Sequence, residues 1–308
     1  MTKDNRTRYG FIGLGHLGGH LAANLIGAGF EVTVHDLSRA AAERHLDAGA
    51  GWADTPAKVA AASDAVITCL PSPAASTEVV TGSDGVLSRL AAGGTWIEMS
   101  TNDRHEIARI AALAERIGVL TLEAPVTGGV HRAASGEITV LVGGSDDLYR
   151  THLPAFEAMG GEVIHMGPLG SASTIKVITN MLAFVHLIAA GEALMLARRG
   201  GIDLAKAFQA IKTSSGNSFV HETESQLILS GSYNVGFTME LACKDLRFAT
   251  KMGRELGVPL ELAALTEQIF IRARERFGAA AWSTIVVKLL EDALDTPLRA
   301  PGFPALLS

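Results

Sequence analysis

Cysteine is scarce in this sequence, which contains only Cys69 and Cys243. The two are far apart and lack the spacing of metal ligands, so we interpret them as buried apolar side chains rather than a disulfide or a zinc site. The ten histidines show no metal-ligand spacing either, and we predict that the protein binds no metal. Unpaired cysteines fit a reducing compartment, so the predicted location is the cytoplasm.

A basic excess is also missing. Lys and Arg number 26 against 32 Asp and Glu, which gives a formal net charge of -6 at pH 7. Because nucleic-acid binding depends on positive charge that neutralises phosphates, we predict no nucleic-acid partner. No uninterrupted apolar stretch reaches the roughly 18 residues of a membrane span, and the polar start MTKDNRTR has no apolar signal core. We therefore expect neither membrane insertion nor export.

The pattern of apolar segments divides the chain into two parts. At 308 residues, 48% of them hydrophobic, the chain can bury more than one core. In the first part, strands alternate with helical stretches such as 104–117 and 147–159; the predicted strands are 8–12, 31–35, 65–70, 95–99, 120–124, 138–142 and 163–166. This alternation predicts an α/β fold, an N-terminal Rossmann domain with a doubly wound, mostly parallel sheet at residues 1–168.

After Gly167 the strand pattern stops. One long apolar run predicts a single helix at 171–199, and helical periods continue over 204–212, 241–256, 260–277 and 284–294. We therefore predict an all-α C-terminal domain at residues 169–308. Its proline-containing tail, from Thr296 onward, cannot continue a helix and should lie along the surface.

A glycine motif, Gly13-Leu14-Gly15-His16-Leu17-Gly18, follows the first predicted strand and precedes an apolar helical period. In this setting the first glycine permits a tight turn, the second lets the backbone approach a pyrophosphate, and the third lets the helix pack on the strand. The helix N-terminus adds an attractive dipole. We predict that these six residues bind a dinucleotide; a purely structural glycine turn is the alternative.

Asp36 ends the second predicted strand about 20 residues beyond the glycines, as expected for a contact to the adenosine ribose. An acid at this position favours the 2′-hydroxyl of NAD over the 2′-phosphate of NADP. Arg39 follows closely and can reach a 2′-phosphate, so NADP stays possible, although we favour an ordinary exposed charge there. The predicted cofactor is NAD.

Three predicted strands end in hydroxyl residues, prolines and glycines. They end in Leu70-Pro71, in Met99-Ser100-Thr101 and in the run APVTGG at 124–129. In open α/β sheets, ligands bind outside the carboxyl ends of the strands, and such residues leave backbone amides accessible. Taken singly, each is explained equally well by ordinary turn chemistry.

Lys176 lies in the long predicted helix with apolar neighbours on both sides. A charge in such a run is costly unless it faces a polar cavity, which favours a functional lysine over a solvated one. Asn180, one helical turn later, lies on the same face. Lys244 gives a weaker signal, because Asp245 and Arg247 indicate that its helix has an exposed face.

Taken together, these motifs resemble one family. The run GFIGLGHLGGHLAANLIGAGF, the LP and MST turns, APVTGG, the K-x-x-x-N of Lys176 and Asn180, and KDL at 244–246 occur in the order of the β-hydroxyacid dehydrogenases typified by 3-hydroxyisobutyrate dehydrogenase. The resemblance spans almost the whole chain. It implies a Rossmann domain, a helical domain that oligomerises, and NAD(P)-dependent oxidation of a small anionic hydroxy acid, or reduction of its semialdehyde. The long predicted helix after Gly170 is too apolar to face water on more than one side, which predicts a homodimer or homotetramer.

The resemblance also implies roles for single residues. Lys176 would be the catalytic lysine, with Asn180 beside it on the substrate; Thr127, Gly128 and Gly129 would cradle the substrate carboxylate; and Leu70, Pro71, Thr101 and Lys244 would contact the cofactor. The chemistry is consistent with a lysine. An alcohol that gives up a hydride must also lose its hydroxyl proton, and an amino group beside the oxygen can stabilise the alkoxide or return the proton.

The sequence departs from the family pattern after the paired glycines, where His131 and Arg132 replace small residues. Our hypothesis is that Arg132, or His131, contacts an anionic substrate that is larger or doubly charged; an exposed loop arginine is the alternative. Ala75, Ala172 and Ala281 also depart from the pattern, so the substrate pocket is expected to differ from that of the valine-pathway enzyme.

Three functions stay open at this point. The first is a dehydrogenase for a 3-hydroxyisobutyrate-like acid, or a semialdehyde reductase of the tartronate, succinic or sulfolactaldehyde type. The second is an imine-reducing relative, against which the presence of Lys176 argues, because such enzymes usually lack that lysine. The third is a non-catalytic NAD-binding module, which the joint presence of Lys176, Asn180, Thr127 and Lys244 disfavours.

Overall fold

A computed structural model describes residues 7–307, so the polar start of the chain up to residue 6 lies outside the described residues. The chain forms two compact units, Met1–Lys176 and Val177–Ser308. The division falls within one continuous helix, α8 (Ser171–Arg199). The domain boundary predicted at residues 168/169 lies just before this helix and stays a prediction.

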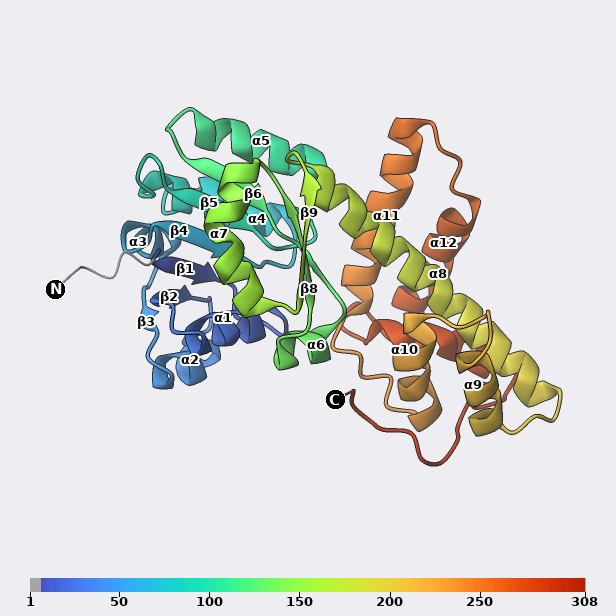
Figure 1. Cartoon of the computed structure of the whole chain (residues 1–308). Coiled ribbons are helices and arrows are strands. Elements are labelled where there is room, and N and C mark those ends of the chain that lie inside the picture. Colours follow the sequence, from blue (N-terminus) through green and yellow to red (C-terminus); the bar gives the residue numbers. More distant parts are fainter. Residues whose placement is uncertain (1–6, 308) are drawn as a thin grey trace. The chain divides into compact units, whose positions relative to one another are not determined.

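The first unit is built on a nine-stranded sheet, within the part of the chain that the structure describes. Its order is β3-β2-β1-β4-β5-β6-β8-β7, with β9 paired to β8 (Figure 1). The strands β1 to β6 run parallel, whereas β8 runs antiparallel to β6 and β7. The strands are β1 (Tyr9–Ile12), β2 (Val32–His35), β3 (Gly51–Trp52), β4 (Ala65–Thr68), β5 (Thr95–Glu98), β6 (Leu120–Glu123), β7 (Val126–Thr127), β8 (Thr139–Gly143) and β9 (Glu162–Gly167).

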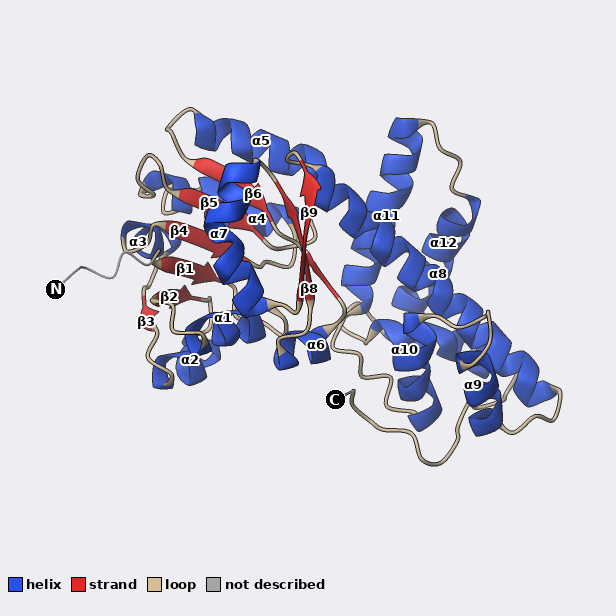
Figure 2. Ribbon diagram, viewed as in Figure 1, coloured by secondary structure: helices blue, strands red, loops and turns tan. Residues whose placement is uncertain are grey.

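Helices cover both faces of this sheet, as Figure 2 shows. Alternate residues of β1 explain why, because Tyr9 and Phe11 pack into one apolar core and Ile12 into another. The helices are α1 (Gly18–Gly27), α2 (Glu43–Asp47), α3 (Pro56–Ala61), α4 (Pro73–Thr81), α5 (Arg104–Glu115), α6 (Val130–Ser135) and α7 (Asp146–Met159). Residues of α1 and α7 contribute to the first core, and those of α3, α4 and α5 to the second. The predicted doubly wound, mostly parallel sheet is therefore confirmed.

The second unit is helical, and Figure 2 draws it without a strand over its described residues. Besides α8 it contains α9 (Leu204–Lys212), α10 (Phe219–Ser230), α11 (Met239–Leu256), α12 (Glu261–Phe277), the 3-10 helix η3 (Ser283–Val287) and α13 (Lys288–Ala293). The helix α10 was not predicted. Its buried face includes His221 and Ser225, which interrupt the apolar period by which helices are detected.

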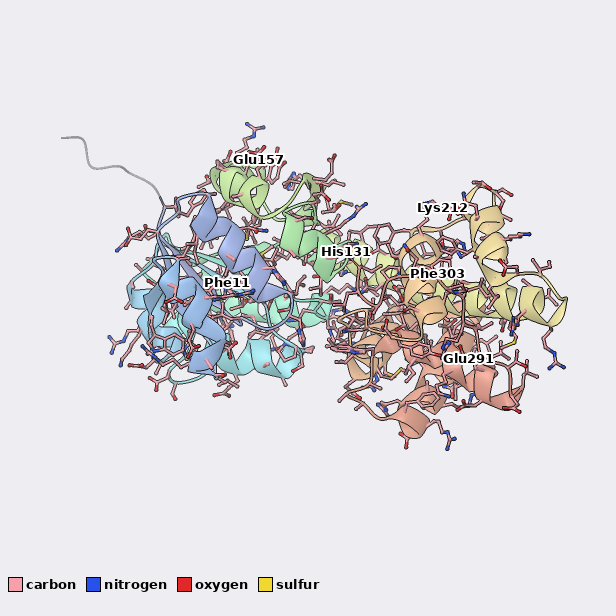
Figure 3. The ribbon with its side chains drawn as sticks, turned by 90° about the horizontal axis from the view of Figure 1, so that it is seen from below. Phe11, His131, Glu157, Lys212, Glu291 and Phe303 are labelled. Carbon is pink, nitrogen blue, oxygen red and sulfur yellow. The ribbon has the colours of Figure 1, made fainter. Side chains whose placement is uncertain are left out.

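The chain end after α13 is irregular, as predicted, and it is largely exposed. It is nevertheless fixed at two points. Leu298 is fully buried, and the Arg299 guanidinium pairs with Glu291, which Figure 3 labels; the distance from Nη1 to Oε1 is 3.0 Å. Further on, the ring of Phe303 packs edge-on against Phe208, with centroids 5.0 Å apart.

The helix α8 has the length and apolar composition of a membrane span, although Lys176 and Glu192 interrupt its apolar sequence. A core helix of a globular domain shows the same composition. In this structure α8 supplies Phe184, Leu187 and Leu194 to the core of the helical unit.

Candidate functional site

The glycine motif forms a tight turn between β1 and α1. Gly13 has φ +99°, and a Cβ atom there would lie 2.3 Å from the carbonyl oxygen of Cys69. A Cβ on Gly18 would lie 2.1 Å from the carbonyl oxygen of Gly13. By contrast, nothing lies within 4 Å of the corresponding point on Gly15, which is exposed. Two glycines are therefore required by packing, and the third leaves open space where a pyrophosphate is predicted.

Asp36 is tied to this turn by its carboxylate. Oδ2 accepts a hydrogen bond from the backbone N–H of Leu14 at 2.8 Å, and Oδ1 accepts one from the N–H of Ser38 at 2.9 Å. The acid is thus fixed beside the glycine motif, where the ribose contact was predicted. Arg39 is exposed, and its guanidinium carbon lies 5.1 Å from the ring centroid of Trp52.

The turns after β4 and β5 are joined by a buried acid that sequence reasoning missed. The hydroxyl of Ser100 accepts from the N–H of Leu70 at 2.7 Å and donates to Glu98 Oε1, which also accepts from the N–H of Ser100 at 2.9 Å. Glu98 is fully buried, and burial raises its pKa. Leu70 and Thr101, both predicted to contact the cofactor, therefore belong to adjacent, hydrogen-bonded turns. Pro71 follows Leu70 in the first turn and is exposed.

The predicted carboxylate cradle follows β7. Gly128 and Gly129 have φ +127° and +90°, a backbone conformation that favours glycine. Each glycine also accommodates one of the two unusual side chains. A Cβ on Gly128 would lie 3.1 Å from Arg132 Cδ, and one on Gly129 3.1 Å from the ring of His131. Arg132 is half-buried and lies in the short helix α6 rather than in an exposed loop, and its contact with a substrate stays a prediction.

His131, labelled on α6 in Figure 3, is half-buried as well. Burial, and then the neighbouring charge of Arg132, lower its pKa. The imidazole is therefore neutral at pH 7, which leaves Arg132 as the cation of this turn. Thr127, at the end of β7, pairs with Thr139 of β8 and is partly exposed.

Lys176 lies in the second turn of α8 and is only 8% exposed. With so little exposure the side chain is not solvated, so the alternative of a solvated helix lysine is wrong. Burying an ammonium group is costly unless its surroundings are polar. Asn180 follows one turn later on the same helix, so their spacing is set by helix geometry. The chain thus carries a buried cation and an amide side by side.

In the helical unit, Asp245 organises Asn180 and Lys244. Its Oδ2 accepts from Asn180 Nδ2 at 2.6 Å, and Lys244 Nζ lies 2.9 Å from its Oδ1. Asp245 is fully buried, so its interpretation as an exposed-face residue was wrong, whereas Arg247 is exposed as expected. The signal that could have identified it is its position in the KDL motif beside a predicted site lysine.

Two family models match the chain. The NAD binding domain of 6-phosphogluconate dehydrogenase matches residues 8–167. The model described as NAD-binding of NADP-dependent 3-hydroxyisobutyrate dehydrogenase matches residues 170–290. The two matches together cover the sheet unit and most of the helical unit, and they show that the chain binds NAD(P).

Individual relatives are similar over most of their length. The 2-(hydroxymethyl)glutarate dehydrogenase of Eubacterium barkeri is 34% identical over 285 residues, which cover 92% of this chain and 95% of that protein. The mitochondrial 3-hydroxyisobutyrate dehydrogenase of Mus musculus is 32% identical over 273 residues, 86% of this chain and 82% of that protein. A crystal structure of 3-hydroxyisobutyrate dehydrogenase from Salmonella typhimurium superposes with a TM-score of 0.85 at 30% identity, covering 92% and 99% of the two chains.

Proposed function

The chain belongs to the β-hydroxyacid dehydrogenase family, and from that premise we propose that Lys176 is its general acid/base in the reversible conversion of a small 3-hydroxy acid to a semialdehyde or oxo acid. The oxidoreductase class follows from the family; the substrate, the direction and the lysine mechanism are proposals. The observation that carries the lysine mechanism is the burial of Lys176, 8% exposed, one turn before Asn180.

The cofactor, when bound, accepts the hydride from the alcohol carbon. The open space at Gly15 and the fixed carboxylate of Asp36 fit the pyrophosphate and the ribose of a dinucleotide. During oxidation Lys176 takes the hydroxyl proton as the neutral amine, and during reduction it returns a proton as the ammonium group. Its low exposure excludes bulk water from the proton transfer, which strengthens electrostatic interactions at the reacting oxygen.

Asn180 has a defined orientation in this proposal. Because Nδ2 donates to the buried Asp245, Oδ1 is the atom that can accept a hydrogen bond from a hydroxyl or an ammonium group. Asp245 thereby orients Asn180 and pairs with Lys244 in the same arrangement. The predicted contact of Lys244 with the cofactor stays a prediction.

We propose NAD as the preferred cofactor. Both carboxylate oxygens of Asp36 are held by backbone N–H groups, so the side chain cannot easily turn away from a 2′-phosphate. Like-charge repulsion would then disfavour NADP. Arg39, which follows Asp36 closely, lies over the ring of Trp52 and so has a partner other than a 2′-phosphate.

The turn at Gly128 favours an acid with a second carboxylate as a candidate substrate. The half-buried Arg132 packs against this glycine and supplies a cation beside the predicted carboxylate cradle. One relative is named for 2-(hydroxymethyl)glutarate, which carries two carboxylates, whereas 3-hydroxyisobutyrate carries one. We therefore place 2-(hydroxymethyl)glutarate-like acids beside 3-hydroxyisobutyrate as candidates.

One assay tests these proposals. The protein is incubated with NAD or NADP and with 3-hydroxyisobutyrate, 2-(hydroxymethyl)glutarate, 3-hydroxypropionate, serine, glycerate, 4-hydroxybutyrate, threonate or tartronate semialdehyde, and nicotinamide absorbance is followed. We expect Lys176→Ala to lower kcat about 1,000-fold. Arg132→Ala should raise KM by about 10-fold for the two-carboxylate acid and much less for the others.

The outcomes separate the remaining functions. No turnover of any acid would favour a non-catalytic NAD-binding module, and turnover of cyclic imines alone would favour an imine reductase. Full activity of Lys176→Ala would remove the lysine mechanism. An unchanged KM of Arg132→Ala for every acid would remove the second-carboxylate contact.

A homodimer or homotetramer is also part of the proposal. Leu182 and Leu196 of α8 are 44% and 76% exposed, and such apolar surface on one helix is typical of an interface between copies. Light scattering coupled to size exclusion tests this directly, and a monomer would contradict it.

A further inference from the structure

Glu123, the last residue of β6, is a buried carboxylate to which none of the roles above is assigned. It is fully buried in the interior of the sheet unit. Its Oε1 accepts hydrogen bonds from the backbone N–H groups of Gly170 and Ala172, each at 2.7 Å, and its Oε2 accepts from the hydroxyl of Ser173. Every partner of this carboxylate therefore lies at the start of α8.

These contacts satisfy donors that a helix start leaves without intrahelical partners. A negative group at this end also interacts favourably with the helix dipole. Burial raises the pKa of Glu123, and the hydrogen bonds from Ser173, Ala172 and Gly170 oppose that shift. Among the described residues, the hydrogen bonds to the two oxygens come from donors at the start of α8, so the side chain acts there as an acceptor.

The anchored turn directly precedes Lys176. Ser173 and Lys176 are three residues apart on α8, which places them on neighbouring turns of one face. On the other side, β6 continues from Glu123 through Ala124 and Pro125 into β7 and Thr127. One side chain therefore joins the start of the lysine-bearing helix to the strand that leads into the predicted carboxylate cradle.

The neighbouring strand leaves room for this side chain. Gly143 of β8 is paired with Glu123, and a Cβ atom on Gly143 would lie 2.4 Å from Glu123 Oε1. Any larger residue at this position would displace the carboxylate from the start of α8. The contact between Glu123 and the start of α8 thus also depends on a glycine at position 143.

We propose that Glu123 is a positioning residue for Lys176: by holding Gly170, Ala172 and Ser173 it fixes the first turn of α8, and with it the placement of the lysine relative to the strand that leads to Thr127. This rests on the proposed role of Lys176. In this proposal Glu123 acts through Lys176 and is assigned no contact with substrate or cofactor. Its effect is on the placement of a group whose rate depends on sub-ångström geometry.

A graded series of variants tests this. Glu123→Ala removes all three acceptor contacts and should lower kcat about 100-fold per folded protein, while Glu123→Gln, which keeps the shape, should lower it about 10-fold. Ser173→Ala removes one donor and should have the smallest effect of the same kind. The Kd for NADH, measured by fluorescence titration, should stay within about 2-fold, because a positioning residue alters turnover rather than cofactor binding.

Hydrogen exchange gives a readout that needs no activity. We expect the peptide covering residues 170–176 to exchange faster in Glu123→Ala and Glu123→Gln than in the unmodified protein. Asp203→Asn is the matched control, because Asp203 also accepts a backbone N–H at a helix start, from Lys206 at 3.0 Å, on α9. It makes the same acid-to-amide change on a helix that carries none of the predicted site residues.

The outcomes separate this proposal from the proposed function. If the unmodified protein turns over no hydroxy acid, the function fails, while faster exchange at 170–176 still supports the anchoring. Faster exchange with unchanged kcat would overturn the positioning role, as would a lowered kcat with unchanged exchange. If Glu123→Ala fails to fold or aggregates, the test rests on Glu123→Gln and Ser173→Ala. Full kcat in both of these variants would overturn the proposal.

Discussion

The two units of the chain contain titratable groups whose pKa values shift in opposite directions. In the sheet unit, His152 of α7 is 2% exposed, its Nδ1 lies 2.8 Å from the Tyr9 hydroxyl, and burial lowers its pKa to about 4. In the helical unit, burial raises the pKa of Glu224, on α10, to about 8. Both shifts favour the uncharged form, which is the free base for the histidine and the acid for the glutamate.

The pH dependence of stability follows from these directions. An unfolded histidine titrates near 6.5, so the unfolded sheet unit binds more protons than the folded one between pH 6.5 and 4, and its stability falls as the pH falls through that range. For Glu224 the folded form binds the extra proton. The stability of the helical unit therefore falls as the pH rises from about 4.5 to 8. The two units are expected to lose stability at opposite ends of the same range.

The largest expected effect is the loss of the His152 contribution in acid. Between pH 7 and 4 this residue should remove up to about 3 kcal/mol from the unfolding free energy of the sheet unit. His152→Gln cannot titrate and keeps a polar partner for Tyr9, so it should abolish that part of the pH slope. Urea unfolding followed by tryptophan fluorescence in a Trp282→Phe background measures it, because Trp52 and Trp96 both lie in the sheet unit.

The contrast between the two units is wrong if the unfolding free energy of the sheet unit falls between pH 7 and 4 as much in His152→Gln as in the unmodified protein. A second histidine gives the control. His35 is also buried, with Nδ1 2.9 Å from the carbonyl oxygen of Ala53. His35→Gln in the same background should retain the slope that His152→Gln removes.

A smaller effect is expected from Glu224. Glu224→Gln removes the ionisation and should stabilise the helical unit by about 1–2 kcal/mol at pH 8, less than the full linkage value because the side chain is partly exposed. At pH 4.5 the two proteins should be equally stable. Hydrogen exchange of the peptides of α10 and α11 measures the difference, and equal protection at pH 8 would contradict the assignment.

Much of this molecule could be predicted from local sequence signals. The strands β1, β2, β4, β5, β6, β8 and β9, the helix α9 and the full length of α8 follow the predicted ranges closely. Repeating apolar periods and glycine turns determine these elements locally. The two-residue strands β3 and β7 were not predicted, because pairing with a neighbouring strand, rather than their own sequence, defines them.

The acids that organise the candidate site could not be predicted in the same way. Glu98 and Glu123 are paired in register on β5 and β6, and both look like ordinary strand-end charges in sequence. Glu123 depends on donors far along the chain, at the start of α8. Glu98 accepts from the nearby Ser100, and it reaches a distant segment only because the Ser100 hydroxyl accepts from the N–H of Leu70. Asp245 was misjudged for the same reason, since its partner Asn180 lies on another helix.

The smallest effect concerns cofactor choice, which we place in the sheet unit alone. Asp36→Asn removes the charge but keeps a side chain that can accept from the N–H of Leu14. Relief of the repulsion should lower the ratio of kcat/KM for NAD over NADP by about 10-fold, or about 1.4 kcal/mol.

Asp147→Asn on α7, an exposed acid of the same unit, is the matched control and should leave the ratio unchanged. If Asp36→Asn also leaves it unchanged, Asp36 does not face the ribose. If the Asp36→Asn variant also changes the hydrogen-exchange protection of α10 and α11, cofactor choice is not confined to the sheet unit. If Asp36→Asn lowers the ratio of kcat/KM for NAD over NADP but leaves the hydrogen-exchange protection of α10 and α11 unchanged, the two units differ in function as well as in pH response.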